Sequence, residues 1–247
     1  MKLKKTVVFN LRNMKKAIFI YYAIVFASFL IAALCNCFRA DYYNDITMSG
    51  VELMTSIFLF ACGLSSFRSD LFLGLQNGVS RKTTLLGYLI SSSIIAVIMG
   101  TVDSIFYTIL NKTSFVKSGF MQLYEEFDCN IVVLLFVTFA WYVFLYLCST
   151  LFGYVIAALY YRMNKSLKLI VSIGVPGFFL IVLPFLDEYV VPDYEIWTRF
   201  NRLLSFMIGN NGTSDRPWNW MISCLLLSTI FAIFSYLLVG RADIKNK

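Results

Sequence analysis

Few side chains in this chain of 247 residues have a type and spacing that could do chemistry. There is no histidine, which excludes histidine-ligated metal sites and nucleophiles activated by a histidine base. The six cysteines lack CxxC spacing, so we expect free thiols; one disulfide among Cys35, Cys37 and Cys129 is the alternative. The sequence lacks G-x-x-x-x-G-K-[ST], so no P-loop holds nucleotide phosphates. We therefore expect no catalytic residue, no metal and no cofactor bound by this chain.

Asp103 is the one acidic residue that the sequence places deep inside a long apolar run. An ionised carboxylate is costly in hydrocarbon, so this side chain should face protein or a watery cavity. It either lines a substrate route, where it would attract cationic cargo, or bonds to neighbouring helices close to Ser104 and Thr108. Trp141 lies in the middle of another apolar run. It either lines a lateral opening of that route or packs between helices.

The composition is typical of an all-α integral membrane protein. The chain is 59% hydrophobic and 14% charged, whereas about a quarter of the residues in a soluble domain are charged. Apolar runs of about 20 residues, enough helix to cross a bilayer, recur along the chain. They lack the period-two alternation of a membrane barrel. We predict a single transmembrane domain over residues 1–247, with six transmembrane helices at about 18–38, 50–67, 84–110, 131–160, 168–186 and 218–240.

The distribution of Lys and Arg predicts how these spans are oriented. With the N-terminus inside, fifteen of the 21 Lys and Arg residues fall in the terminal segments and the inner loops, and six fall in the outer segments. Positive charge of this kind marks the cytoplasmic side. We expect both termini in the cytoplasm and the chain in the cytoplasmic (inner) membrane. Most acidic residues, with Glu52 among them, are then assigned to the outer segments.

Residues 1–17 carry apolar side chains at helical spacing, with Lys and Arg on the adjoining face. This pattern is typical of an amphipathic helix at a membrane surface. We expect it to lie on the inner leaflet before the chain turns into the first span. The alternative is that these charges only flank and orient that span.

The fifth predicted span and the segment after it have two further features. Gly174, Pro176 and Gly177 are expected to bend the span. Residues 187–217 are too many for a simple loop, and an apolar stripe at helical spacing runs from Ile196 to Met207. We predict an extracellular or re-entrant helix there, in contact with lipid or with the other spans. We expect three of its apolar residues to form an outer gate: Trp197, Phe200 and Leu204.

The inner loop between the second and third spans, residues 67–82, carries the most informative pattern. Ser69 or Asp70 can cap the N-terminus of a short helix, because their side-chain oxygens accept free backbone N–H groups. The Asn-Gly pair at Gly78 can end that helix, because Gly tolerates the left-handed conformation of a helix stop. Ser80 can then cap the third span. The loop is therefore predicted to be a short, rigid cytoplasmic helix between two spans.

Leu71, Phe72 and Leu75 give this short helix an apolar surface. Together with the Asn-Gly-Val-Ser-Arg-Lys sequence that ends at Lys82, the loop resembles that of ABC-2-type ABC transporter permeases. The layout of the whole chain is similar as well: an amphipathic N-terminal helix, six spans, and a helical segment outside between the fifth and sixth. The resemblance covers the chain in layout and about fifteen residues in letters.

The resemblance implies a function, partners and site residues. In that family the loop is a coupling helix that lies in a groove of a separate ATPase subunit. This chain would then be the permease subunit of an ATP-driven exporter that moves amphipathic or hydrophobic cargo, a peptide or a drug, outward. Its partners would be two copies of the ATPase, which bind ATP and Mg, a second copy of itself or a paralogous permease, and the lipid bilayer, but no nucleic acid. The coupling role is carried over to Asp70, Leu71, Phe72, Leu75, Asn77, Gly78 and Arg81.

Three other classes of function are alternatives to the permease. An ion-coupled secondary carrier would place ionisable groups in several spans, and Asp103 stands alone. An intramembrane aspartyl enzyme needs two aspartates that share a proton, and the predicted spans offer only Asp103. A non-catalytic membrane immunity or assembly protein fits the sequence as an alternative.

Overall fold

The structure of this chain is a computed structural model. It describes residues 2–38, 48–110, 116–125, 127, 130–182, 184–185, 195–209 and 216–240. Its elements are α1 (Lys2–Phe38), β1 (Met48–Ser49), α2 (Val51–Gln76), α3 (Arg81–Leu110), β2 (Val116–Lys117), α4 (Gly119–Leu123), α5 (Ile131–Arg162), α6 (Lys165–Gly177), the π-helix η1 (Phe178–Val182), α8 (Glu195–Ile208) and α9 (Pro217–Gly240).

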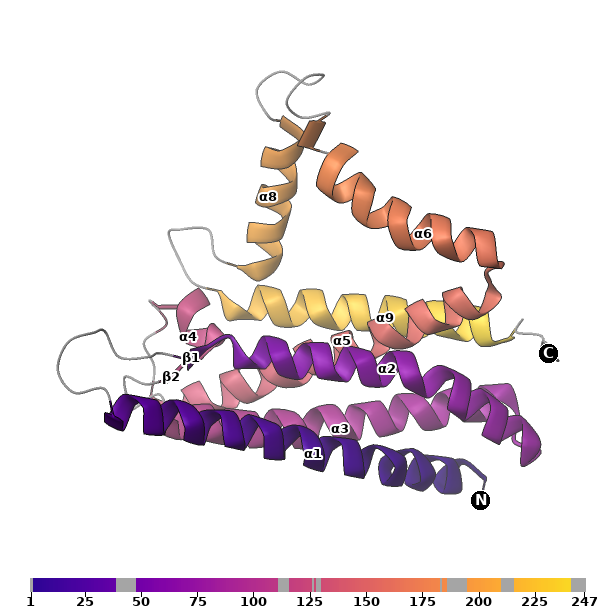
Figure 1. The fold of residues 1–247 in the computed structure, drawn as a ribbon, viewed down its shortest axis with the longest axis horizontal. Coiled ribbons are helices and arrows are strands. Elements are labelled where there is room, and N and C mark those ends of the chain that lie inside the picture. Colours follow the sequence, from indigo (N-terminus) through magenta and orange to yellow (C-terminus); the bar gives the residue numbers. More distant parts are fainter. Residues whose placement is uncertain are drawn as a thin grey trace.

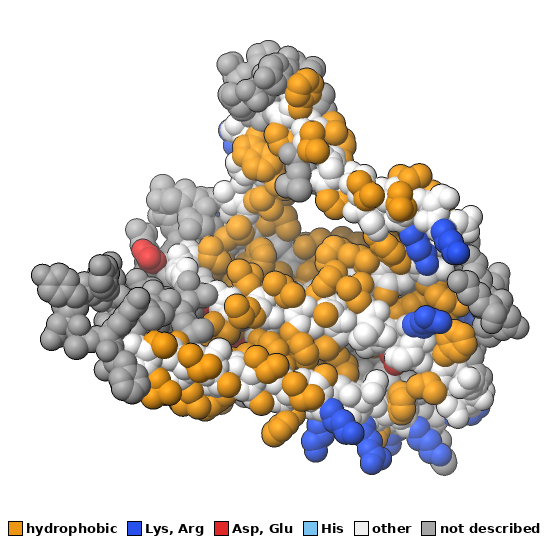
Figure 2. All heavy atoms as spheres, viewed as in Figure 1, with side chains coloured by type: hydrophobic (Ala, Val, Ile, Leu, Met, Phe, Trp, Pro, Cys, Tyr) orange, Lys and Arg blue, Asp and Glu red, His pale blue; other side chains and the backbone are white. Residues whose placement is uncertain are grey.

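Five long helices form a bundle with α5 at its centre (Figure 1). Helix α5 packs against α2, α3 and α9, and α1 packs on the outer side of α3. Among the described residues, the five helices that are long and apolar enough to cross a membrane are α1, α2, α3, α5 and α9. The prediction of an all-α, multi-pass membrane protein is therefore confirmed. Large apolar side chains cover much of the bundle's outer surface (Figure 2), where a bilayer would contact them.

The helix α1 differs from the expected arrangement of an interfacial helix followed by a turn. It runs without a break from Lys2 to Phe38. Its first half is held on α3: Asn10 Nδ2 donates a hydrogen bond to Ser91 Oγ (3.4 Å), and Met14 is buried in the core. Because α3 packs along it, nothing forces the chain to turn at residue 17.

The predicted span over 168–186 is not among these five helices. Helix α6 ends at Gly177, and the following residues continue as η1. Pro176 lies inside α6 and lacks the N–H that would continue the α-helical hydrogen bonds. No residue of α6 is buried. Together α6, η1 and α8 form an arm that stands away from the bundle (Figure 1), and Figure 2 shows an opening between this arm and the bundle.

The end of the bundle opposite the N-terminus holds short elements that the sequence did not indicate. Strands β1 and β2 pair in parallel, Met48 with Val116 and Ser49 with Lys117. Helix α4 follows, and Ser118 Oγ caps it by accepting a hydrogen bond from Met121 N (3.2 Å). These elements tie the start of α2 to the chain between α3 and α5.

The predicted helix after the fifth span is present as α8. It runs from Glu195 to Ile208, and the next residue, Gly209, has a φ of 80°, the left-handed conformation expected of a helix stop. Tyr124 OH donates to the carbonyl of Ile208 (2.6 Å), which fixes the end of α8 beside α4. Asn219 Nδ2 donates to the carbonyl of Phe206 (3.2 Å) from the start of α9. The C-terminal end of α8 is thus anchored to the bundle.

Glycines allow α2 and α5 to approach until their backbones touch. A Cβ added at Gly63 would lie 2.2 Å from the carbonyl oxygen of Thr150, and one at Gly153 would lie 2.2 Å from that of Phe60. Small residues with this role are common where membrane helices pack closely. The α2–α5 contact is therefore set by backbone geometry at a single crossing.

Candidate coupling surface and buried polar cluster

The turn between α2 and α3 is a tightly capped helical hairpin. Gly78 has a φ of 63°, and Val79 N donates to the carbonyl of Gly74 (2.8 Å), which together form a Schellman helix stop. On the other side, Ser80 Oγ accepts a hydrogen bond from Thr83 N (3.2 Å) and caps α3. Lys2 Nζ also donates to the carbonyl of Gly78 (2.9 Å), which ties α1 to this hairpin. The predicted stop at Gly78 and cap at Ser80 are both confirmed.

The predicted N-terminal cap of a separate short helix is absent, because α2 is continuous through this region. Phe67 and Leu71 are buried with Tyr88 and Tyr154 in a second core cluster, so the helix is held in register past the point where we expected a break. Ser69 Oγ instead donates to the carbonyl of Ser66 (3.0 Å), within the helix. The last two turns of α2 therefore replace the predicted coupling helix.

The residues assigned to the coupling surface separate into buried and exposed positions. Leu71 and Asp70 are buried inside the chain's own bundle, so their side chains are not presented to a partner. Phe72 is 38% exposed. Asn77 is exposed, and its Nδ2 bonds to the carbonyl of Leu73 (2.8 Å). Two further positions complete the set: Arg81 is the first residue of α3, and the Leu75 side chain lies outside the described residues.

Phe72 lines a groove of about 450 Å³ between the end of α2 and the turn from α5 to α6. The apolar part of the groove includes Phe67, Tyr160 and Tyr161. Its basic part comes from Arg68, Lys165 and Lys168. A segment with an apolar side chain and acidic neighbours would fit such a surface, because it satisfies both the aromatic floor and the positive rim.

Asp103 lies at the centre of a polar cluster inside the bundle. Its Oδ1 accepts a hydrogen bond from Tyr22 OH of α1 (2.9 Å), and its Oδ2 accepts one from Tyr146 OH of α5. Nearby, Tyr21 OH and Thr55 Oγ1 are 2.7 Å apart and join α1 to α2. The cluster therefore connects α1, α2, α3 and α5. These hydrogen bonds agree with the second of the two predictions for Asp103, that it bonds to neighbouring helices.

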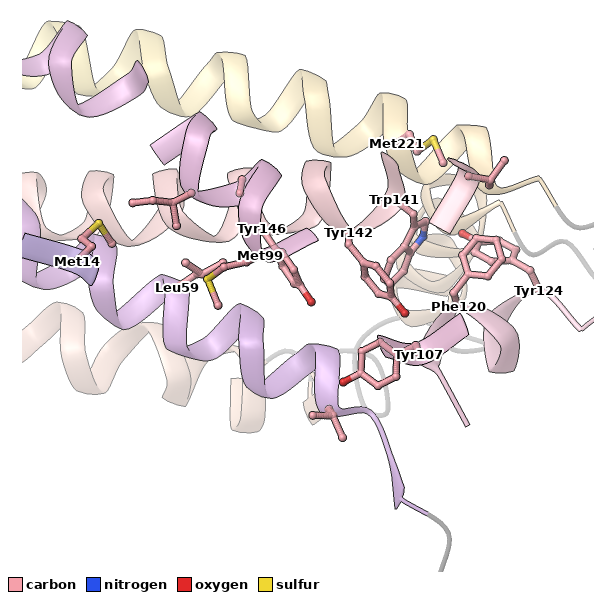
Figure 3. Close-up of a cluster of buried hydrophobic side chains, with 14 of the residues drawn as sticks. Met14, Leu59, Met99, Tyr107, Phe120, Tyr124, Trp141, Tyr142, Tyr146 and Met221 are labelled. Atoms are coloured by element: carbon pink, nitrogen blue, oxygen red, sulfur yellow. The ribbon is translucent and has the colours of Figure 1, made fainter. Parts of the chain in front are cut away.

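Glu52, in the first turn of α2, is a second buried carboxyl group in this region. It is 1% exposed, and its Oε1 accepts hydrogen bonds from Gly119 N and from Tyr142 OH (3.4 Å). Its Oε2 has no hydrogen-bond partner within the described part of the chain. Tyr142 and Tyr146 lie one helical turn apart on α5 with their rings stacked (Figure 3). The two carboxyl groups are thus held by adjacent turns of one helix.

Trp141 and the residues predicted to form a gate occupy different surroundings. Trp141 is buried, and its ring packs against Phe120 and Trp220 (Figure 3 shows it beside Phe120). Trp141 therefore packs between helices, which is the second of the two predictions made for it. Trp197, Phe200 and Leu204 all lie on the exposed arm helix α8. Neither Asp103 nor Trp141 lines the cavity of about 130 Å³ between α3, α4 and α5.

Among the described residues, no group of three or more His, Cys, Asp and Glu side chains could hold a metal ion. The described thiols of Cys35, Cys62, Cys148 and Cys224 are free. What the structure does present is a rigid hairpin next to an aromatic, basic groove.

Comparison of the chain with models of protein families, with curated proteins and with solved structures gives no match.

Proposed function

We propose that this chain is the membrane permease subunit of an ATP-driven exporter of the ABC-2 type, coupled to a separate ATPase through the α2–α3 hairpin. The observation that carries the proposal is the unbroken run of α2 from the bundle into the hairpin. Two caps at Gly78 and Ser80 fix the turn. A force on the hairpin is therefore delivered directly to two membrane helices.

The proposed ATPase contact is the groove around Phe72. The chain has no P-loop, so energy from ATP must arrive through a protein contact. The groove combines a large exposed aromatic residue with basic residues from a second turn, Lys165 and Lys168. Aromatic and cationic side chains of this kind often dominate the energy of protein interfaces.

In the proposed complex the chain crosses the cytoplasmic membrane six times, with both termini in the cytoplasm. Basic side chains gather at the end of the bundle that holds the N-terminus and the hairpin (Figure 2), which supports this orientation. Helix α6 and η1 would provide the crossing over 168–186 when they pack against a second copy of the chain or a paralogous permease. The exposed apolar arm supports this, because apolar helices need lipid or protein around them.

The proposed cargo is an amphipathic peptide or drug that is moved outward, as the resemblance implies. The arm helix α8 would then lie at the outer exit and carry the gate of Trp197, Phe200 and Leu204. Asp103 and Trp141 are not proposed to line the route, because both are buried in packed clusters.

The test is co-purification of the wild-type chain and of Phe72→Asp with the ATPase from the native membrane. The wild type should retain a P-loop ATPase. Phe72→Asp should remain folded and inserted but lose it, because truncation of a buried interface side chain costs about 2 kcal/mol or more and the new carboxylate adds an unpaired buried charge.

Phe200→Asp is the matched control, since Phe200 is 39% exposed against 38% for Phe72 and lies on α8, away from the groove. It should retain the ATPase. A wild-type chain that retains no ATPase, or a Phe72→Asp variant that retains it in full, contradicts the proposed coupling.

An ion-coupled carrier is the second candidate, because Glu52 is buried beside Asp103 and the latter no longer stands alone. The two functions differ in what drives them. Transport by reconstituted chain that follows an imposed pH or ion gradient, with no ATPase present, would favour the carrier.

A further inference from the structure

A cavity of about 480 Å³ lies between the first turns of α1 and the last turns of α2. Its volume is within the range of pockets that hold small organic ligands. The residues that matter for its chemistry are Lys2, Lys5, Phe9, Asn10, Asp70 and Leu73. It opens on the far side of the hairpin from the Phe72 groove, with which it shares no lining residue.

The packing of α1 and α2 on α3 explains why this space exists. A Cβ added at Gly87 of α3 would lie 2.7 Å from Thr6 Cγ2 of α1. A Cβ added at Gly74 of α2 would lie 2.5 Å from Thr84 Oγ1 of α3. Both helices are therefore held close to α3, and the wedge between α1 and α2 stays open.

Two residues that line this cavity, Asp70 and Asn10, each carry a buried acceptor atom without a partner in the described part of the chain. Asp70 is 5% exposed and Asn10 is 4% exposed. Asp70 Oδ2 and Asn10 Oδ1 make no hydrogen bond within the described residues, although Asn10 Nδ2 donates to Ser91 Oγ (3.4 Å) and Asp70 Oδ1 accepts from Ser69 Oγ (3.5 Å). A buried acceptor without a donor is costly, and here each helix supplies one such atom on a residue that lines the same cavity. A ligand that brings several N–H or O–H donors would satisfy both.

The rim of the cavity is positively charged, in contrast to the acceptor oxygens of its buried part. Lys2 and Lys5 are exposed cations, and Phe9 and Leu73 add exposed apolar surface beside them. A ligand that fits both regions carries a cationic donor group at one end and an anionic group next to it. An ammonium supplies three donors and no acceptor, and phosphate pairs with Lys.

We propose that this cavity binds a phosphoethanolamine group, as the headgroup of a membrane phospholipid. On binding, the side chains of Asp70 and Asn10 turn toward the ligand, and the primary ammonium donates to Asp70 Oδ2 and Asn10 Oδ1. The phosphate pairs with Lys5 and Lys2, and the acyl chains leave over Phe9 toward the apolar face of α1. The site does not depend on the ATPase contact, and it holds for either candidate function.

The test compares phosphatidylethanolamine with phosphatidylcholine, whose trimethylated ammonium has no N–H donor but carries the same charge. Lipid retained by the full chain is measured by native mass spectrometry after release from micelles that contain both lipids. The wild type should retain phosphatidylethanolamine in at least tenfold preference. That preference should disappear in Asp70→Asn and in Asn10→Leu, each removing one acceptor, and persist in Asp103→Asn.

Equal retention of the two lipids by the wild type overturns the proposal. So does a preference that survives in a folded Asp70→Asn or Asn10→Leu protein, with folding checked by gel filtration and thermal unfolding. Soluble phosphoethanolamine and inorganic phosphate are added as competitors. Failure of both to displace the lipid at equal concentration assigns the site to the lipid, whereas displacement by phosphoethanolamine alone assigns it to the free headgroup and overturns the lipid source.

Discussion

Tyr22 and Tyr146 donate from two different helices to the same carboxyl group, that of Asp103. Each hydrogen bond is made in the interior of the bundle, where a carboxyl oxygen left without a donor would be costly. At Glu52 one oxygen, Oε1, is satisfied in a similar way, by Tyr142 and by the backbone of Gly119. At the scale of single residues, the bundle is specified by tyrosines that bridge helices to buried acids.

Tyr146→Phe tests this view. The change removes the donor to Asp103 Oδ2 and leaves the ring in place, so the free energy of unfolding should fall by about 1–3 kcal/mol. Tyr160→Phe is the control, because the hydroxyl of Tyr160 shares an exposed hydrogen bond with Ser172 Oγ (2.8 Å). Thermal unfolding in detergent measures both, and equal stability of the two variants would show that the cluster contributes little.

The burial of Asp103 could be predicted from the sequence, but that of Glu52 and Asp70 could not. Asp103 is surrounded by apolar residues in the chain itself. Glu52 lies next to a predicted loop, and the group that buries it, Gly119, is 67 residues away in sequence. From the sequence, Asp70 is predicted to cap a short helix. Only the packing of Phe67 and Leu71 shows that the helix continues through this position. Long-range contacts of this kind have no signature in one sequence.

At the scale of elements, the crossing of α2 and α5 determines how the bundle is built. The two helices meet through Gly63 and Gly153, each against the backbone of the other helix. Overpacking such a contact forces the helices apart. The helix stop at Gly78 and the cap at Ser80 follow from local chemistry and were predictable, whereas this crossing depends on which helices become neighbours.

Gly63→Ala should lower the free energy of unfolding by about 1–3 kcal/mol, because the new methyl group would press on the carbonyl of Thr150. Gly177→Ala is the matched control: the same methyl group there meets no atom within 4 Å. Thermal unfolding in detergent measures both. The double variant Gly63→Ala, Gly153→Ala should cost less than the sum of the single changes, since one separation of the helices relieves both clashes. Full additivity would indicate two independent contacts.

At the scale of the whole molecule, the bundle and the arm differ in how they are stabilised. The bundle has two buried clusters of aromatic and aliphatic side chains. The arm of α6, η1 and α8 is apolar but largely exposed. A sequence can show that residues 168–186 are apolar, but it cannot show which segments pack against them. In the proposed complex a second subunit supplies that packing.

Cysteine labelling in intact cells tests most directly whether the α2–α3 hairpin faces the cytoplasm in a chain that crosses the membrane six times, as we propose. In a cysteine-free background, single cysteines are placed at Gln76 in the hairpin, at Lys165 before α6 and at Arg216 before α9. An impermeant maleimide added outside should label Arg216→Cys and leave the other two unlabelled until the cells are opened. Labelling of Gln76→Cys in sealed cells would contradict the orientation and the ATPase contact with it. If Arg216→Cys stays unlabelled together with Lys165→Cys, the segment that contains α6 and η1 does not cross the membrane and the chain has five spans.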